Sequence, residues 1–555
     1  MSNNPNAIPS PSAPTWQNWT GNLVHKPASD GVNYYFAPTS LSDLKSALAQ
    51  VAKIPGAIIR VSGQRHSQPP LVADDNRNAV PAKTTEFLVD MSCYRDLGPG
   101  QNQSIVLGPG TNQVTVNAGV REDALDAFLT QNNLMMKTVT AGGFFSIGGM
   151  TAVDVHGGTV NAPIFAETAS AFNILLADGT VKTFDATLPP VNGWSPLQFA
   201  RVSLGGLGII TSITLDVLPR PSATTLDGGM IRYLLKDKAA FIAQFQQLLT
   251  GPLKHDRMEV FYSPYAAAPN LPFPVDLENF LVLWWDENSN SGPKNSATQP
   301  ETACELLQEG RFGAPLLGGL AKYAAKYVRE SQYFSNPYSP LHIPPVPPSG
   351  FAAIALNEIE TQAADANKIN SDLWLTASSQ VMFMSYYFEM PNLDAVGLGK
   401  VWDGLAVVAD RVIQDDNFHI AAPMEFRFVK AGNSAMAGSY STNPNAWFIN
   451  LDLIGFIEPT PAADYPQLLL QFFADVERDW VAMGGITHNG KMYGFYDPKT
   501  HSATGPFNPN FLAELRARRD DARRGAPLTA YSAYRKSMDP KGLFYNNFLR
   551  QLLEP

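Results

Sequence analysis

The segment from residue 58 to residue 67 constrains the fold of this chain more than any other. Its sequence, Ile-Ile-Arg-Val-Ser-Gly-Gln-Arg-His-Ser, begins as an apolar, β-branched strand and then turns at Ser62 and Gly63. Backbone N–H groups in such a turn can form a concave nest for phosphate oxygens, and Gly63 lets the chain approach a ligand closely. Because His66 follows at the tip, the segment predicts a phosphate-binding turn and an imidazole that reach one ligand. A plain glycine turn with a solvent-facing histidine is the alternative.

Composition sets broad limits on the fold and the class of protein. A chain of 555 residues is too long for one ordinary core, so we expect two domains or more. The net charge of -10 and the lack of a basic block argue against a nucleic-acid partner. No run of about 18 apolar residues predicts a membrane span. Cys93 and Cys304 are far apart and match no metal spacing, so they predict neither a disulfide framework nor a metal site.

The location of the protein is not fixed by its first residues. Residues 1–14 lack the basic start and apolar stretch of a signal peptide. A mature protein whose signal has been removed would look the same. We expect such a secreted or periplasmic form, with a cytoplasmic protein as the alternative.

Hydrophobic periodicity predicts an α+β chain in two parts. Up to Pro219-Arg220-Pro221, which breaks the pattern, short strands alternate with helices. From 222 to 495, long aromatic strands alternate with helices, which is typical of an antiparallel sheet with helices on one face. Predicted helices cover 40–51, 121–132, 238–249, 467–483 and 511–524. Predicted strands include 56–62, 86–91, 103–117, a hairpin over 171–185, 280–285, 381–388 and 446–456.

Two glycine-rich segments follow the first turn. Residues 140–158 hold doubled glycines followed by His156 and Gly157, and residues 203–210 read Ser-Leu-Gly-Gly-Leu-Gly-Ile-Ile. Both permit close backbone approach to a flat ligand. The Gly-x-Gly-x-x-Gly spacing of a Rossmann fold is absent, which disfavours a nicotinamide site. A glycine-rich hairpin without a ligand is the alternative for the first of them.

A Glu-x-Arg pair stands out in the second part of the chain. Strand alternation places Glu425 and Arg427 on one face, and their apolar neighbours predict that both charges are partly buried and paired. Glu259 is a further acid in an apolar strand. An ion pair without a chemical role is the alternative for the pair, and an exposed strand acid is the alternative for Glu259.

Together these motifs resemble the vanillyl-alcohol-oxidase, or PCMH-type, family of FAD oxidases. The turn at 62–67, the segment at 140–158 and the segment at 203–210 resemble its three flavin-contacting pieces in order. His488-Asn489-Gly490-Lys491 resembles the His-x-Gly-Lys segment of sugar and aldonolactone oxidases. Residues 539–547 resemble the closing motif of the same enzymes. The Glu-x-Arg pair resembles the alcohol-oxidising branch, which includes the type II cholesterol oxidases.

The resemblance implies an α+β fold of two domains. A PCMH-type FAD-binding domain would cover 15–221 and be completed by about 496–555. A substrate domain at 222–495 would hold a large antiparallel sheet flanked by helices. The cofactor would be FAD, bonded covalently through His66. The other implied FAD contacts are Arg60, Val61, Ser62, Gly63, Gln64, Arg65, Ser67, Thr140, Gly142, Gly143, Gly148, Gly149, Val153, His156, Gly157, Gly208, Ile210 and Asn546.

The implied activity is oxidation of a secondary alcohol with dioxygen as the electron acceptor. Glu425, helped by Glu259, would take the hydroxyl proton, and Arg427 would stabilise the reduced flavin. The aromatic runs at 382–388 and 447–450 favour an apolar substrate. This indicates oxidation of the 3β-hydroxyl of cholesterol or a related sterol, with isomerisation to the 4-en-3-one. We also expect a monomer that contacts a membrane surface transiently.

Two alternatives remain open at this stage. The first is a polyol, aldonolactone or secondary-metabolite oxidase on the same scaffold, which the His-x-Gly-Lys segment favours. The second is a flavin-binding protein without turnover, which the Glu425–Arg427 pair argues against.

Overall fold

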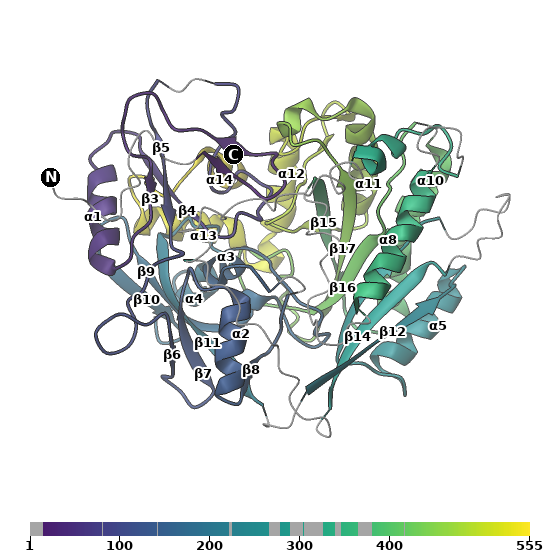
Figure 1. The fold of residues 1–555 in the computed structure, drawn as a ribbon, viewed down its shortest axis with the longest axis horizontal. Helices are drawn as coiled ribbons and strands as arrows, with labels where there is room; N and C mark the ends of the chain where they lie inside the picture. Colours follow the sequence, from purple (N-terminus) through teal and green to yellow (C-terminus); the bar gives the residue numbers. More distant parts are fainter. Residues whose placement is uncertain are drawn as a thin grey trace.

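The structure is a computed structural model that describes residues 15–79, 82–140, 143–220, 225–265, 278–288, 304, 326–338, 346–363, 380–415 and 417–554. Residues 1–14 and Gly142, on which two of the expectations above depend, lie outside these ranges. In the described ranges the strands form three sheets of three or more strands (Figure 1). The two smaller of these belong to the N-terminal part, and the largest belongs to the middle of the chain.

The N-terminal part holds one parallel and one antiparallel sheet. The three-stranded parallel sheet has the order β3 (Tyr35–Phe36), β5 (Glu86–Asp90), β4 (Ile58–Ser62). The six-stranded sheet has the order β10 (Val181–Asp185), β9 (Ala169–Leu175), β11 (Ile209–Pro219), β7 (Gln113–Asn117), β6 (Ile105–Leu107), with β8 (Leu134–Met136) paired to β11. The helices here are α1 (Leu41–Val51), α2 (Glu122–Gln131), α3 (Ile147–Ala152) and α4 (Pro196–Ala200). These bounds confirm the predicted helices at 40–51 and 121–132 and the predicted hairpin.

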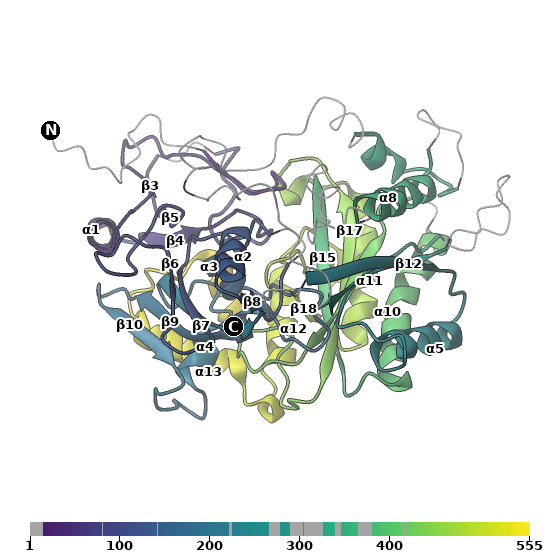
Figure 2. The same cartoon turned by 60° about the horizontal axis from the view of Figure 1, so that its bottom comes forward.

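A seven-stranded antiparallel sheet dominates the second part, as predicted. Its order is β12 (Thr225–Tyr233), β14 (Phe280–Asn288), β13 (Arg257–Tyr262), β16 (Met424–Lys430), β17 (Trp447–Phe456), β15 (Val381–Met390), β18 (Ile486–Thr487). Helices α5 (Lys238–Leu249), α10 (Ala395–Gln414) and α11 (Gln467–Ala482) pack on one face. Helix α8 (Pro348–Ala363) lies over part of the other face (Figure 2). The prediction of helices on one face only was therefore wrong.

Alternation along β15 shows how the two faces of this sheet differ. Met382, Met384 and Tyr386 belong to the large core beneath α10 and α11. Phe383 belongs to a smaller apolar cluster on the opposite face. Buried side chains on both faces explain why the strand is apolar or aromatic almost throughout.

The end of the chain returns to the N-terminal sheets through α12 (Pro509–Arg519), α13 (Pro527–Met538) and α14 (Asn547–Leu553) (Figure 1). Arg60 on β4 donates hydrogen bonds to the carbonyl oxygens of Leu71 at 2.6 Å, Leu204 at 2.6 Å and Phe544 at 2.7 Å. One buried guanidinium therefore joins three segments that are far apart in the sequence. The domain boundary at 221 stays a prediction, since residues 221–224 lie outside the described ranges.

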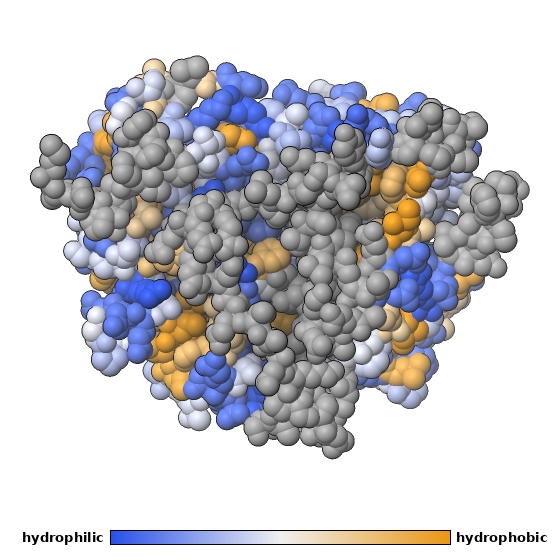
Figure 3. Space-filling model, viewed as in Figure 1, coloured by the Kyte–Doolittle hydropathy of each residue, from blue (hydrophilic) through white to orange (hydrophobic). Residues whose placement is uncertain are grey.

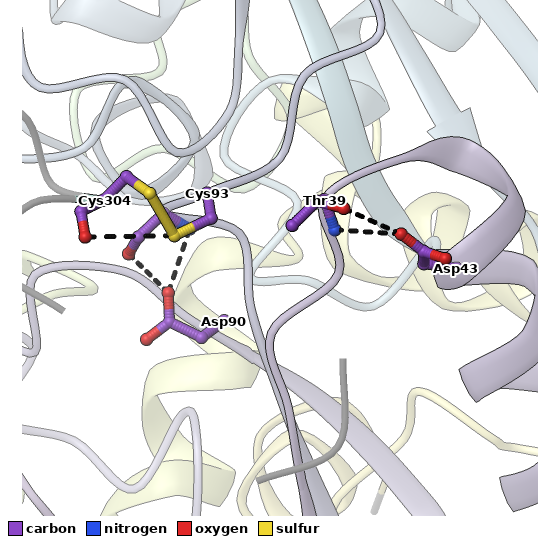
Figure 4. Close-up of a disulfide and its surroundings, with 6 residues drawn as sticks. Thr39, Asp43, Asp90, Cys93 and Cys304 are labelled. Carbon is purple, nitrogen blue, oxygen red and sulfur yellow. Dashed lines mark hydrogen bonds between the residues drawn. A yellow bond between two sulfur atoms is a disulfide. The ribbon is translucent and has the colours of Figure 1, made fainter. Parts of the chain in front are cut away.

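A disulfide joins Cys93 to Cys304 across a sequence separation of 211 residues (Figure 4). The sequence analysis predicted no disulfide, because two cysteines this far apart carry no spacing signal. Cys93 follows the turn after β5, where Asp90 accepts hydrogen bonds from the backbone and hydroxyl of Ser92. The bridge therefore ties the first half of the chain to the segment that leads away from β14.

The described surface shows no large apolar face in the view of Figure 3, where hydrophobic residues form small groups among hydrophilic ones. Within the described ranges, no helix is both long and apolar enough to cross a membrane. The remaining short elements are β1 (Trp16–Gln17), β2 (Val24–His25), β19 (Tyr496–Asp497), β20 (Ser502–Ala503) and the 3₁₀ turns Phe165–Thr168, Ala462–Asp464 and Ala522–Arg524.

Candidate active site

One cavity runs from the turn after β4 to the face of the seven-stranded sheet. Its walls include most of the residues that the sequence singled out. These are Arg60, Val61, Ser62, Gly63, Gln64, Arg65, His66, Ser67, Thr140, Gly148, Gly149, Val153, His156, Gly208, Ile210, Glu425 and Arg427. The structure therefore brings the predicted flavin contacts and the Glu-x-Arg pair to a single space.

Four of the described candidates lie outside the cavity wall. Gly157 packs so closely on the segment after β8 that a Cβ atom would lie 1.9 Å from the carbonyl oxygen of Val139. Asn546 caps α14 and donates to the carbonyl of Pro70 at 2.9 Å. Gly143 donates its N–H to Thr140 Oγ1. Glu259 contacts Arg427 from outside the cavity wall. Gly157 and Asn546 have structural contacts that account for their residue types.

The turn after β4 is held in shape by contacts at both of its sides. At Gly63 a Cβ atom would lie 2.3 Å from Ser146 Oγ, so a larger residue would require the Ser146 hydroxyl to move. Arg65 adopts the left-handed conformation with φ of 62°, which is unfavourable for a side chain with a Cβ atom. Its carbonyl accepts a hydrogen bond from Trp19 N at 2.7 Å. A strained residue held this way at a cavity is typical of a binding site.

His66 lies in an aromatic pocket. Among the residues that the structure describes, neither ring nitrogen has a hydrogen-bond partner, and both nitrogens are shielded from solvent. The ring centroid lies 4.8 Å from those of Phe144 and Phe145 and 5.2 Å from that of Trp19. Burial, with further repulsion from Lys491 and Arg121, lowers the pKa of His66 to about 3. The imidazole is therefore neutral, which is the form in which a nitrogen can bond to another group.

The residues of this wall suit a flavin dinucleotide. Within the part of the chain that the structure describes, the amide Nε2 of Gln64 and both ring nitrogens of His66 are buried without a hydrogen-bond partner. Unpaired buried donors and acceptors beside a cavity indicate a ligand that would satisfy them. The backbone of the turn would hold the diphosphate, and the ring system would lie toward His66 and the sheet.

The acidic and basic residues on the sheet form one buried cluster. Arg427 Nη2 lies 2.5 Å from Glu425 Oε1 and 2.5 Å from Glu259 Oε1. Glu425 is opposite Asp452 across the β16–β17 pair. Burial raises the pKa of Glu425 to about 8, with repulsion from Glu259 and Asp452 adding to the rise and Arg427 opposing it. Glu425 can therefore take up and release a proton close to neutral pH.

A second polar row lies beside this cluster. His156 Nε2 lies 3.0 Å from Asn450 Oδ1, and Asn450 Nδ2 donates to Ser385 Oγ at 2.9 Å. His488 stacks on Tyr387, with ring centroids 5.8 Å apart. Burial lowers the pKa of His156 to about 3 and that of His488 well below its usual range. Both imidazoles are neutral in this wall.

Sequence reasoning gave no role to several residues of the wall, above all Asp452. Lys491 also lines the cavity, with Nζ 3.9 Å from the centre of the Phe383 ring. The signal for Lys491 was the His-x-Gly-Lys segment. The signal for Asp452 was its alternation with Asn450 in an otherwise apolar strand, which marks a polar face.

The aromatic runs that favoured an apolar substrate contribute little to the described wall. Of residues 382–388 only Phe383 lines the cavity, and none of residues 447–450 does so. The remaining side chains pack mainly into the core under the helices. On the side of the seven-stranded sheet, the cavity is lined by Glu425, Arg427, Asp452 and Lys491 together with Phe383 and His488.

Curated relatives of this sequence act on aldonolactones by name. The L-gulono-1,4-lactone dehydrogenase of Mycobacterium tuberculosis is 26% identical over 254 residues, which is 46% of this chain and 50% of the relative. The L-gulonolactone oxidase of Mus musculus is 25% identical over 205 residues, 37% of this chain and 40% of the relative. The D-arabinono-1,4-lactone oxidase of Candida albicans is 23% identical over 327 residues, 57% of this chain and 51% of the relative. The chain spans about half the length of the curated relatives it matches.

No protein-family model matches the chain, whereas solved structures match it over its full length. Cholesterol oxidase from B. sterolicum superimposes with a TM-score of 0.68 at 15% identity and covers 99% of both chains. Xylooligosaccharide oxidase from Myceliophthora thermophila superimposes with a TM-score of 0.56 at 13% identity, over 100% of this chain and 98% of the other. The resemblance carried by the sequence motifs is thereby confirmed: the chain has the PCMH-type FAD-oxidase fold.

Proposed function

We propose that this protein is an FAD-dependent oxidase of a secondary alcohol, and that its substrate is an aldonolactone or a related polyol. One observation carries the proposal: a single cavity holds both the His66 turn and the Glu425–Arg427 pair. A cofactor site and an acid–base group that share one space are the minimum for oxidising an alcohol.

The residues of the cavity have different roles in the proposed reaction. Glu425, with its raised pKa, accepts the hydroxyl proton of the substrate when it is ionised. Arg427, held between Glu425 and Glu259, orients the base and offsets its charge. Bound FAD would supply the two-electron acceptor, and His66 would hold it covalently. Lys491 adds a positive charge to the same wall.

The charged side chains on the sheet side of the cavity support this substrate class. A site for a polyhydroxylated ligand needs several polar groups aimed at hydroxyls. Glu425, Arg427, Asp452 and Lys491 supply such groups. The names of the curated relatives support the same class.

A sterol is the second candidate, and one observation favours it. The cholesterol oxidase structure matches this chain over 99% of both chains. The bordering apolar cluster, which includes Phe261, Leu281 and Phe383, could receive an apolar ring system. Oxidation followed by isomerisation would then be expected, as the sequence analysis first predicted.

The cofactor is tested by acid precipitation of the purified protein, with a His66→Ala variant as the control. We expect yellow colour to stay with the precipitated wild-type protein and to be released from the variant. Colour released from both would remove the covalent bond and keep the flavin. A colourless protein, without flavin after reconstitution with FAD, would contradict the proposed function.

The substrate is tested by anaerobic mixing of the flavoprotein with L-gulono-1,4-lactone, D-arabinono-1,4-lactone and cholesterol. We expect the lactones to bleach the flavin and cholesterol to leave it oxidised. Bleaching by cholesterol alone would favour the second candidate. Because the relatives include both oxidases and a dehydrogenase by name, reoxidation is then followed with dioxygen and with a dye.

A further inference from the structure

Asp452 is a carboxylate in the cavity wall with an unused acceptor. It is 6% exposed on β17, and its Oδ1 accepts no hydrogen bond from the residues that the structure describes. It lines the same cavity as Glu425 and Arg427. Burying a carboxylate oxygen without a donor is costly. The position therefore suits a ligand that brings a donor of its own.

The pairing of the strands sets where that donor would be. Asp452 and Glu425 are directly opposite each other in the β16–β17 register. Opposite residues of an antiparallel pair have Cβ atoms about 5 Å apart and project from the same face. The two carboxylates therefore enter the cavity side by side. Hydroxyl groups on neighbouring carbon atoms of a lactone ring or polyol can meet both of them.

We propose that Asp452 is a specificity-determining residue that accepts a hydrogen bond from the hydroxyl next to the one that is oxidised. The substrate is then a vicinal diol within a lactone or polyol. This inference rests on the proposed oxidase function and narrows its substrate. An alcohol without a second hydroxyl leaves the Asp452 carboxylate unpaired, and the protein discriminates against it.

The test compares wild type with Asp452→Leu, which removes the acceptor, and with Asp452→Asn, which keeps an oxygen acceptor. The exposed Asp464, changed to Asn, is the matched control. Each protein is first matched for flavin content and unfolding temperature. Asp452→Ala, which also removes the acceptor, replaces the Leu variant if that variant does not fold. The substrates are L-gulono-1,4-lactone and its monodeoxy analogues, each of which lacks one hydroxyl.

We expect one analogue to have a kcat/KM with wild type that is roughly 10- to 100-fold below that of the full lactone, mainly through KM. Asp452→Leu should lower kcat/KM for the full lactone by a similar factor. For that analogue, wild type and Asp452→Leu should have the same kcat/KM, because the missing hydroxyl and the missing carboxylate belong to the same contact. Asp452→Asn should discriminate against that analogue more strongly than Asp452→Leu does and less strongly than wild type. Asp464→Asn should match wild type.

Two results would overturn the inference, and they are distinguishable. If wild type oxidises the lactone and Asp452→Leu keeps the full discrimination among the analogues, the oxidase function stands and the role of Asp452 is refuted. If neither lactones nor polyols reduce the wild-type flavin, the proposed substrate class fails and the inference fails with it.

Discussion

Burial raises the proton affinity of the Glu425 carboxylate, and its charged neighbours modify that affinity further. Arg427 favours its ionised form, while Glu259 and Asp452 favour its protonated form. A base is active only when it is unprotonated, so the rate should rise with pH as Glu425 loses its proton. The cluster thus makes the reaction sensitive to pH near neutrality.

We expect kcat/KM for flavin reduction to rise with pH along a limb centred near pH 8, the pKa of Glu425. Glu259→Gln removes a negative charge that repels ionised Glu425 and competes with it for Arg427. The pKa of Glu425 should therefore fall, and this limb should move to lower pH. Stopped-flow reduction between about pH 6 and about pH 10 measures the limb. Asp464→Asn is the control, and a limb that stays in place in Glu259→Gln would refute the coupling.

Removal of the base itself should be more severe. In Glu425→Gln the amide cannot accept the substrate proton, so we expect kcat to fall by roughly 10²- to 10⁴-fold. Flavin content should stay at the wild-type level, because Glu425 lies on the sheet side of the cavity. A variant that retains more than a tenth of the wild-type rate would assign the base to another residue.

Residue-scale prediction succeeded within a single strand and failed between strands. Glu425 and Arg427 were placed together from alternation alone, and they lie in one cluster. Asp452 is opposite Glu425 on the next strand, and the register between strands cannot be inferred from either sequence separately. Alternation within a strand showed which of its side chains share the polar face. The pairing of the strands determines which polar side chains of the neighbouring strand lie beside them.

At the scale of elements, Gln68 joins the turn after β4 to the seven-stranded sheet. Its amide donates to the carbonyl of Val381 at 3.1 Å and accepts from Phe383 N at 2.9 Å, as a neighbouring strand would. Its own N–H donates to the carbonyl of Gly490 at 3.2 Å. One buried side chain therefore fixes the turn against β15.

Gln68→Leu should lower the free energy of unfolding by about 2 kcal/mol, because it leaves a buried N–H and a buried carbonyl of β15 unpaired. Urea denaturation of the flavoprotein measures the loss, and Gln50→Leu at the exposed end of α1 is the control. Equal stability of the two variants would show that the turn does not depend on this link.

The elements themselves were largely predictable, but the face that each strand presents was not. Helices α1, α5 and α11 and strands β15 and β17 have bounds close to those expected from the sequence. Along β15, however, both faces are buried, so alternation identified a strand without showing which side lines the cavity. The apolar pocket inferred from its aromatic residues was in large part the core on the other side.

At the scale of the whole molecule, the Cys93–Cys304 bridge closes a loop across 211 residues. Such bridges persist in oxidising compartments. This supports our proposal that the protein is secreted or periplasmic.

Cys93→Ser should lower the free energy of unfolding by roughly 3 to 5 kcal/mol, because the unfolded chain regains the freedom that the bridge removes. Thermal unfolding with and without a reductant measures this. The reductant should destabilise wild type and leave Cys93→Ser unchanged. Wild type that is insensitive to a reductant under denaturing conditions would contradict the bridge.

The guanidinium of Arg60 has a consequence for the order of events during synthesis. A ribosome releases the chain from its N-terminus, and early domains usually fold as they emerge. Here the carbonyl of Phe544 that Arg60 engages is made 484 residues later. The full set of hydrogen bonds to this guanidinium can therefore form only when nearly the whole polypeptide has been made. We expect a cofactor that binds beside β4 to enter after that point.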